Sequence, residues 1–166
     1  MLAEVEPRLI RGLPSGHYAF ASLALSRALL AQARGHLPKA LAEADSALAI
    51  LEANAAAGHQ TESAAPIVLR RRADIEREMG RFSEAQRDAE RAVELFEKQS
   101  EPGVPSENVG LAYLGLGQAL RAQGRVADAQ RAFESALQQL EPSMGASHPA
   151  TRQARALAEG TPVAPR

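Results

Sequence analysis

The histidines are the side chains of this sequence best suited to acid–base or metal chemistry, and they are scattered along it. They are His17, His36, His59 and His148. None has a histidine or carboxylate four residues away, the spacing that places two metal ligands on one face of a helix. We therefore expect these histidines in solvent or at helix ends, with no metal site.

Other catalytic patterns are also missing from the sequence. Gly115-Leu-Gly117 lies inside a helical pattern, which predicts close helix packing rather than a loop that holds a phosphate. Serine, aspartate and histidine occur without the strand–turn–helix context of a nucleophile elbow. The sequence predicts neither an enzyme nor a bound cofactor.

The run of Arg70, Arg71 and Arg72 is the sharpest polar feature. Consecutive residues of a helix point in different directions, so the run cannot form one patch. Helical spacing puts Arg70 on one stripe with Asp74 and Arg77. Such a stripe favours an acidic ligand, because a guanidinium can hold a carboxylate with two hydrogen bonds. Asp74 counts against this hypothesis, since it could neutralise Arg70 or Arg77 through helical pairing.

Composition narrows the class of protein. The net charge of −1 over 166 residues gives no field that would attract nucleic acid or acidic lipid. No apolar stretch is long enough for a membrane span, and the start lacks the pattern of a signal peptide. Without cysteine there are no disulfides or thiol ligands. We expect a single soluble domain in the cytoplasm.

These side chains must be positioned by a repeated unit. Gly35, Gly80 and Gly124 lie 45 and 44 residues apart. Alanines follow each glycine after five and twelve residues, at Ala40, Ala85, Ala129, Ala47, Ala92 and Ala136. A glycine past the last turn can end a helix, and small residues let the next helix approach closely. A fixed period of this length predicts stacked helical hairpins.

The third copy of this pattern resembles the tetratricopeptide repeat. The matching residues are Tyr113, Leu116, Gly117, Leu120, Gly124, Val126, Ala129, Phe133, Ala136 and Leu137. The period exceeds the family's usual length of about 34 residues, and it resembles the long variant of kinesin light chains and bacterial signalling proteins. Residues 145–151 match the Gly-x-x-His-Pro-x-Thr segment of that variant. The resemblance implies an all-α, right-handed superhelix of antiparallel helix pairs.

The pattern predicts about eight helices in one domain. They are expected near 2–11, 17–34, 37–56, 64–79, 82–98, 106–123, 126–140 and 149–159. The predicted units are the end of a preceding repeat (1–13), three repeats (14–58, 59–101 and 102–143), a half-repeat cap (144–160) and a disordered tail (161–166). The half units at both ends favour the C-terminal part of a larger bacterial signalling or regulatory protein.

The resemblance also implies a concave groove, lined by one stripe of each first helix, that receives a partner segment. The matching residues here are Leu25, Leu29, Gln32, Arg70, Asp74, Arg77, Leu111, Leu114, Gln118 and Arg121. This predicts a groove that is apolar in repeats one and three and cationic at its arginines. The expected partner is a protein or peptide, and the arginines favour an acidic one. A spacer that self-associates as a homo-oligomer is the alternative, and nucleic acid and membrane are not expected.

Arg27 and Arg72 depart from the family pattern, which has leucine at their position. A lone buried guanidinium is too costly, so each is expected to reach solvent or to pair with a carboxylate of the adjacent second helix. The candidate partners are Asp45 or Glu43 for Arg27, and Asp88 or Glu84 for Arg72.

Overall fold

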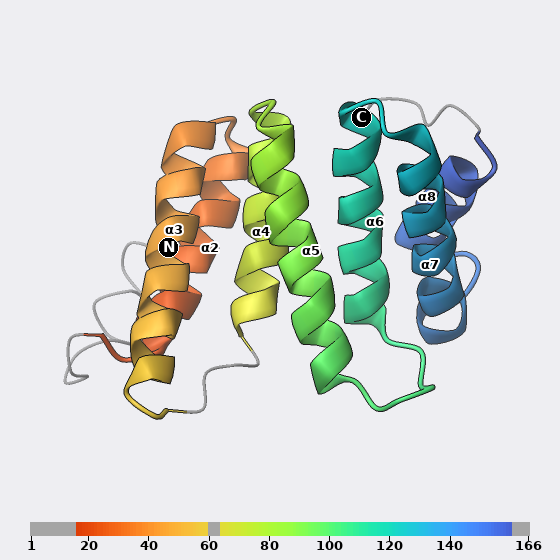
Figure 1. The fold of residues 1–166 in the computed structure, drawn as a ribbon. Coiled ribbons are helices and arrows are strands. Elements are labelled where there is room, and N and C mark those ends of the chain that lie inside the picture. Colours follow the sequence, from red (N-terminus) through yellow and green to blue (C-terminus); the bar gives the residue numbers. More distant parts are fainter. Residues whose placement is uncertain (1–15, 60–63, 161–166) are drawn as a thin grey trace.

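The computed structural model describes residues 16–59 and 64–160, and Figure 1 shows the arrangement. Its helices are α2 (Ala19–Ala33), α3 (Leu37–Ala56), α4 (Ala65–Glu78), α5 (Phe82–Gln99), α6 (Glu107–Ala122), α7 (Val126–Met144) and α8 (Pro149–Ala158). There is no strand in the described part of the chain. The all-helical prediction is confirmed. The predicted helix at 2–11 and the predicted disordered tail fall outside the described residues.

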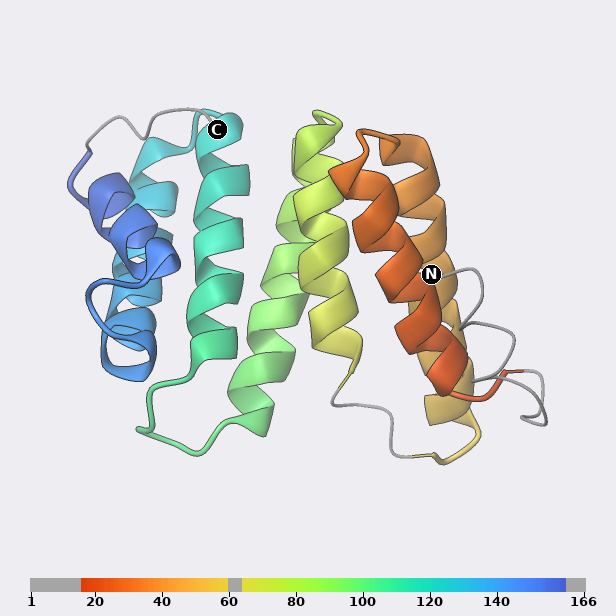
Figure 2. The same ribbon diagram turned by 180° about the vertical axis from the view of Figure 1, so that it is seen from behind.

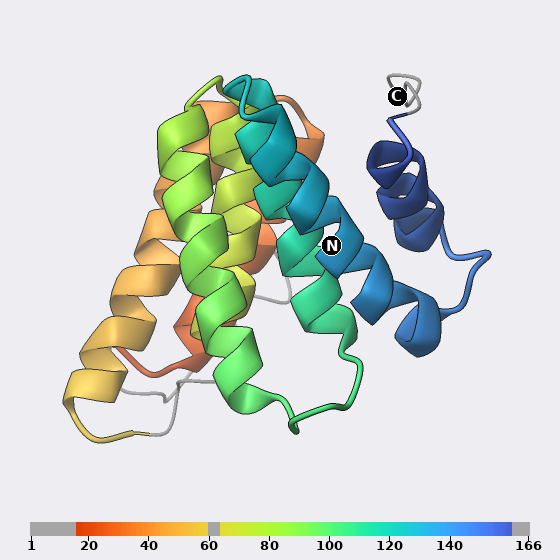
Figure 3. The same cartoon turned by 45° about the vertical axis from the view of Figure 1, so that its right-hand side comes forward.

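The helices form antiparallel pairs that stack side by side. The first members, α2, α4, α6 and α8, lie on one face of the array, and α3, α5 and α7 lie on the other (Figures 1 and 2). Each helix packs on its neighbours in sequence, and α8 packs against α7 at the end of the array (Figure 3). This arrangement is that of an α-solenoid.

The three hinge glycines repeat one turn. Gly35, Gly80 and Gly124 have φ values of 74°, 75° and 77°, a left-handed conformation that glycine adopts without Cβ strain. After each hinge, the next N–H donates back across the helix end, in the pattern of a Schellman cap. These bonds run from His36 to Ala31, from Arg81 to Glu76 and from Arg125 to Leu120, at 2.9, 2.8 and 3.0 Å.

Small residues set the spacing between helices. Ala85, Ala92 and Ala129 are at most 1% exposed, as the period predicted. A Cβ added to Gly117 would lie 2.5 Å from the ring of Phe133, so this glycine serves close packing. The same prediction for Gly115 is wrong, because a Cβ there would meet nothing within 4 Å. Gly115 and Gly117 of α6 therefore face different surroundings.

Helix α7 runs further than expected. The sequence predicts its end near residue 140, although the helix contains Pro142, which cannot donate a helical hydrogen bond. The helix instead continues to Met144, and the N–H of Gly145 donates to the carbonyl of Glu141 at 3.0 Å. The turn thus closes around the proline, and Gly145, with φ 85°, ends the helix.

Arg72 joins three helices on the side of α4 that faces α3 and α5. Its Nε and Nη2 donate to the two carboxylate oxygens of Asp88 on α5, at 2.5 and 2.9 Å. Its Nη1 donates to Asp45 of α3 at 2.9 Å. The predicted pairing with Asp88 is confirmed. Asp45, which was expected to serve Arg27, binds the arginine of the next repeat, because the long side chain of Arg72 spans the interface. Arg27 itself is exposed.

Candidate binding groove

A groove of about 1190 Å³ runs along the face formed by the first helices, from the end of α2 across α4 and α6 to α8. Eight of the ten predicted stripe residues line it: Gln32, Arg70, Asp74, Arg77, Leu111, Leu114, Gln118 and Arg121. Helical spacing therefore places residues from three repeats on one concave surface.

Leu25 and Leu29 do not line this groove. Both are half-buried, and Leu25 packs against the core cluster that holds Leu51 and Val68. The apolar part of the groove comes from Leu111 and Leu114 of α6, while α2 contributes Gln32. The groove is accordingly more polar than its sequence pattern predicted.

Two arginines outside the predicted stripe, Arg71 and Arg152, also line the groove. Arg71 follows Arg70 on α4, and the groove is wide enough to include both. Arg152 comes from α8. The half-repeat match that aligns Leu157 with Leu116 also aligns Arg152 with Leu111, at the same offset of 41 residues. Extending that register through α8 would have found it.

Positive charge dominates the groove. Its lining contains five arginines but only two carboxylates, those of Asp74 and Glu78, in a chain whose net charge is −1. The cations are Arg70, Arg71, Arg77, Arg121 and Arg152. Glu78 accepts a hydrogen bond from Gln32 Nε2 at 2.8 Å, which bridges α2 and α4. The cationic excess lies on α4, α6 and α8.

These arginines have few acceptors of their own. Among the described residues, the one ion pair made by a groove arginine joins Arg71 Nη1 to Asp74 Oδ2, at 3.9 Å. The Nε atoms of Arg70 and Arg77 are buried without a hydrogen-bond partner. The Arg121 guanidinium lies 5.7 Å from the ring centre of Phe133, a cation–π contact that leaves its donors free of a carboxylate.

Burial shifts two charged groups of α4, Asp74 and Arg70, toward their neutral forms. It raises the pKa of the Asp74 carboxyl, although Arg70, Arg77 and Arg71 all act in the opposite direction. Burial, followed by repulsion from Arg71, lowers the pKa of Arg70. Both groups are thus held partly out of water without a complete set of polar partners. An incoming anion would supply the acceptor that Arg70 lacks.

A tetratricopeptide repeat family model matches residues 63–141, which hold α4, α5, α6 and most of α7. The chain belongs to the tetratricopeptide repeat family over this segment. No curated protein matches the chain. The family is a non-enzymatic repeat scaffold that mediates protein–protein interaction.

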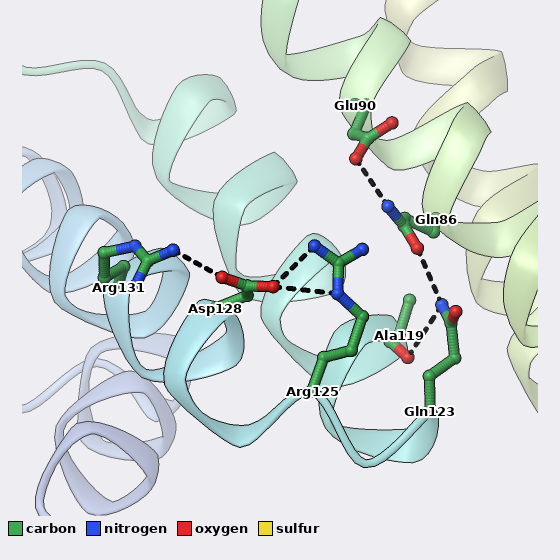
Figure 4. A network of polar contacts seen from close by, with 7 residues as sticks. All are labelled: Gln86, Glu90, Ala119, Gln123, Arg125, Asp128 and Arg131. Atoms are coloured by element: carbon green, nitrogen blue, oxygen red, sulfur yellow. Dashed lines mark hydrogen bonds and ion pairs between the residues drawn. The ribbon is translucent and has the colours of Figure 1, made fainter.

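On the outer face of the repeats, by contrast, arginines are paired with a carboxylate (Figure 4). Asp128 accepts from Arg125 Nε at 2.8 Å and also from Arg131, so one carboxylate serves two guanidinium groups. Beside this cluster, Gln123 Nε2 donates to Gln86 Oε1 at 2.9 Å and links the α6–α7 turn to α5. Polar groups on this face satisfy one another.

The remaining histidines and carboxylates of the described residues form no metal site. The histidines His17 and His148 accept hydrogen bonds from the N–H groups of Ala19 and Ala150, both at 3.2 Å, so they act at helix starts. Within residues 16–59 and 64–160, no group of three or more histidine, aspartate and glutamate side chains could hold a metal ion. None of the helices in these ranges has the length and apolar character needed to cross a membrane.

Proposed function

We propose that this tetratricopeptide array binds an acidic segment of a partner protein in the groove between α4, α6 and α8. The observation that carries the proposal is the set of five groove arginines whose one ion pair is 3.9 Å long. Guanidinium groups that lie in a concave surface without short ion pairs favour carboxylates from outside the chain.

The groove also suggests how such a segment would lie. Arg70 and Arg77 on α4 present buried Nε donors, and Arg152 lies on α8 across α6. Leu111 and Leu114 of α6 supply apolar surface between them. A segment crossing the groove would therefore place acidic side chains against the arginines and an apolar side chain against α6.

The wider setting of this proposal comes from resemblance. The long period and the segment at residues 145–151 resemble bacterial signalling proteins, so we infer a cytoplasmic regulator in which the groove recruits a partner. The alternative is a spacer that self-associates and has no groove ligand. Four large apolar side chains of the described residues are exposed, and a self-associating surface would have to use some of them: Tyr18, Ile67, Val104 and Val126.

Fluorescence anisotropy tests the groove directly. The probe is a labelled peptide of about ten residues that alternates glutamate with leucine and so spans the groove when extended. We expect Arg70→Glu/Arg121→Glu to weaken binding at least about tenfold, because each reversal replaces an attraction with a repulsion. Arg131→Glu is the control, since Arg131 is 71% exposed on the outer face. Equal affinities of the two variants would contradict the proposal.

Two further measurements separate the alternatives. A peptide with glutamine in place of glutamate should bind more weakly, and added salt should weaken the binding of the glutamate peptide. Sedimentation velocity should show a monomer at micromolar concentration. A concentration-dependent dimer that binds neither peptide would favour the alternative of a self-associating spacer.

A further inference from the structure

Asp74 is the acidic residue at the centre of the cationic lining. Arg70 and Arg71 precede it by four and three residues on α4, and Arg77 follows it by three, so all three lie within helical reach. The Asp74 side chain is 25% exposed and faces the groove. One carboxylate of the chain itself therefore sits where a ligand carboxylate would bind.

Asp74 offsets part of the positive charge of the arginines but does not satisfy their hydrogen-bond donors. Within residues 16–59 and 64–160 its one ion pair is the 3.9 Å contact with Arg71, and the Nε atoms of Arg70 and Arg77 remain buried without acceptors. The Arg72–Asp88 contact on the opposite side of the same helix is bidentate, at 2.5 and 2.9 Å. A carboxylate that occupies the region but binds loosely can be displaced by one that binds tightly.

From this geometry we propose that Asp74 is a resident counter-ion of the groove, with which an acidic partner segment competes for the arginines of α4. The inference rests on the proposed function and adds its regulation. Asp74 keeps the empty groove from holding an uncompensated cluster of like charges. Asp74 also sets how acidic a segment must be to bind. A weakly acidic segment interacts with the arginines less favourably than Asp74 does, so it does not displace Asp74.

Displacement of Asp74 links ligand binding to a proton. Burial already raises the pKa of Asp74, and the nearby arginines hold it down. A ligand carboxylate that takes over those arginines adds a like charge, and both changes raise the pKa further. The bound state then holds more protons than the free state, so affinity increases as the pH falls toward the pKa of Asp74.

The other charged and titratable groups around Asp74 fix how this pH dependence must be measured. Those on α4 are Arg70, Arg71, Arg77 and Glu78, and those facing it or its arginines from α6 and α8 are Glu107, Arg121, His148 and Arg152. The glutamates of the peptide also titrate. The contribution of Asp74 is therefore the difference between wild type and an Asp74→Asn variant over the same pH range.

The test is the affinity of the glutamate–leucine peptide for Asp74→Asn, wild type and Glu90→Gln. Glu90 is an exposed glutamate of α5 outside the groove, so its variant controls for the loss of one negative charge. We expect Asp74→Asn to bind about fivefold to twentyfold more tightly than wild type, and Glu90→Gln to stay within about twofold. Asparagine has the shape of aspartate, and circular dichroism checks that the variant is folded.

The outcomes distinguish the inference from the function beneath it. If wild type prefers the glutamate peptide but Asp74→Asn binds it no more tightly, the groove binds acidic peptides. The proposal that Asp74 competes with the ligand is then wrong. Binding by Asp74→Asn alone would support the inference strongly. If neither protein binds either peptide, both proposals fail.

A measurement on the unmodified protein gives a second test. The carboxyl resonance of Asp74, followed by NMR over a pH titration, should report a higher pKa with the glutamate peptide bound than without it. An unchanged or lowered pKa would overturn the inference even if the peptide binds.

Discussion

Two neighbouring arginines of α4 meet opposite surroundings. Arg72 points toward α3 and α5, where it holds Asp88 with two hydrogen bonds and Asp45 with a third. Arg70 points into the groove, where its Nε is buried without an acceptor. The same type of side chain thus joins repeats on one side of the helix and has unpaired hydrogen-bond donors on the other. The contrast separates residues that hold the array together from residues available to a partner.

The largest expected effect on stability is at Arg72, on the side of α4 that contacts α3 and α5. Replacing Arg72 with methionine leaves Asp88, which is 8% exposed, without its cation. We expect the free energy of unfolding to fall by about 3 kcal/mol, because breaking a buried ion pair strands the remaining charge. Arg70→Met is the matched variant and should change stability by less than about 1 kcal/mol. Urea denaturation measures both, and equal losses would erase the distinction between the two sides.

Glu76, a buried residue of α4, is expected to make the stability of the fold depend on pH. Burial, followed by repulsion from Asp88, raises the pKa of this 7% exposed glutamate to about 7, although Arg72 opposes the shift. The folded protein therefore keeps a proton that the unfolded chain releases at an ordinary pKa of 4.5. The stability that Glu76 contributes is full below pH 4.5 and is lost as the pH rises toward 7.

Glu76→Gln removes this dependence. At pH 8 we expect the variant to be about 2–3 kcal/mol more stable than wild type, whereas near pH 4 the two should agree. Glu90→Gln, on the outer surface, should follow wild type at both pH values. Chemical denaturation at the two pH values provides the measurement. A variant that is less stable than wild type at pH 8 would mean that the ionised Glu76 is well paired.

Gly115 and Gly117 of α6 test the same division with smaller energies. Gly117→Ala would push a methyl group into the buried ring of Phe133, so we expect a loss of about 1–2 kcal/mol. Gly115 borders the groove and has open space around it, so Gly115→Ala should gain about 0.5–1 kcal/mol from helix propensity. Thermal melting of both variants decides the point. A loss at Gly115 would mean that this surface is not open.

Salt gives the mildest test. Exposed pairs such as Arg91 with Glu94 contribute little to stability, so added salt should change the stability of the fold little. Binding of an acidic peptide to the groove should weaken clearly over the same range of salt. Parallel melting and anisotropy experiments compare the two responses.

The sequence predicted what lies within one repeat better than what lies between repeats. The hinge glycines, the buried alanines and the pairing of Arg72 with Asp88 all follow from the helical register of a single hairpin. Asp45 was one of two candidate partners for Arg27, because register alone does not show that Arg72 reaches back to α3. Likewise, the sequence did not show that Leu25 packs into the core. The offset between stacked hairpins decides both, and a period in the sequence does not specify that offset.

The near-identical hinges at Gly35, Gly80 and Gly124 bear on how such a chain can change over evolutionary time. Because each hinge closes with the same backbone angle and the same back-donated hydrogen bond, the second helix leaves the first in the same way every time. A gene duplication that copies the stretch from one hinge to the next would insert a whole hairpin with compatible ends. The length of the recognition surface can thus grow or shrink in whole units, while point mutations on the first helices alter its charge independently.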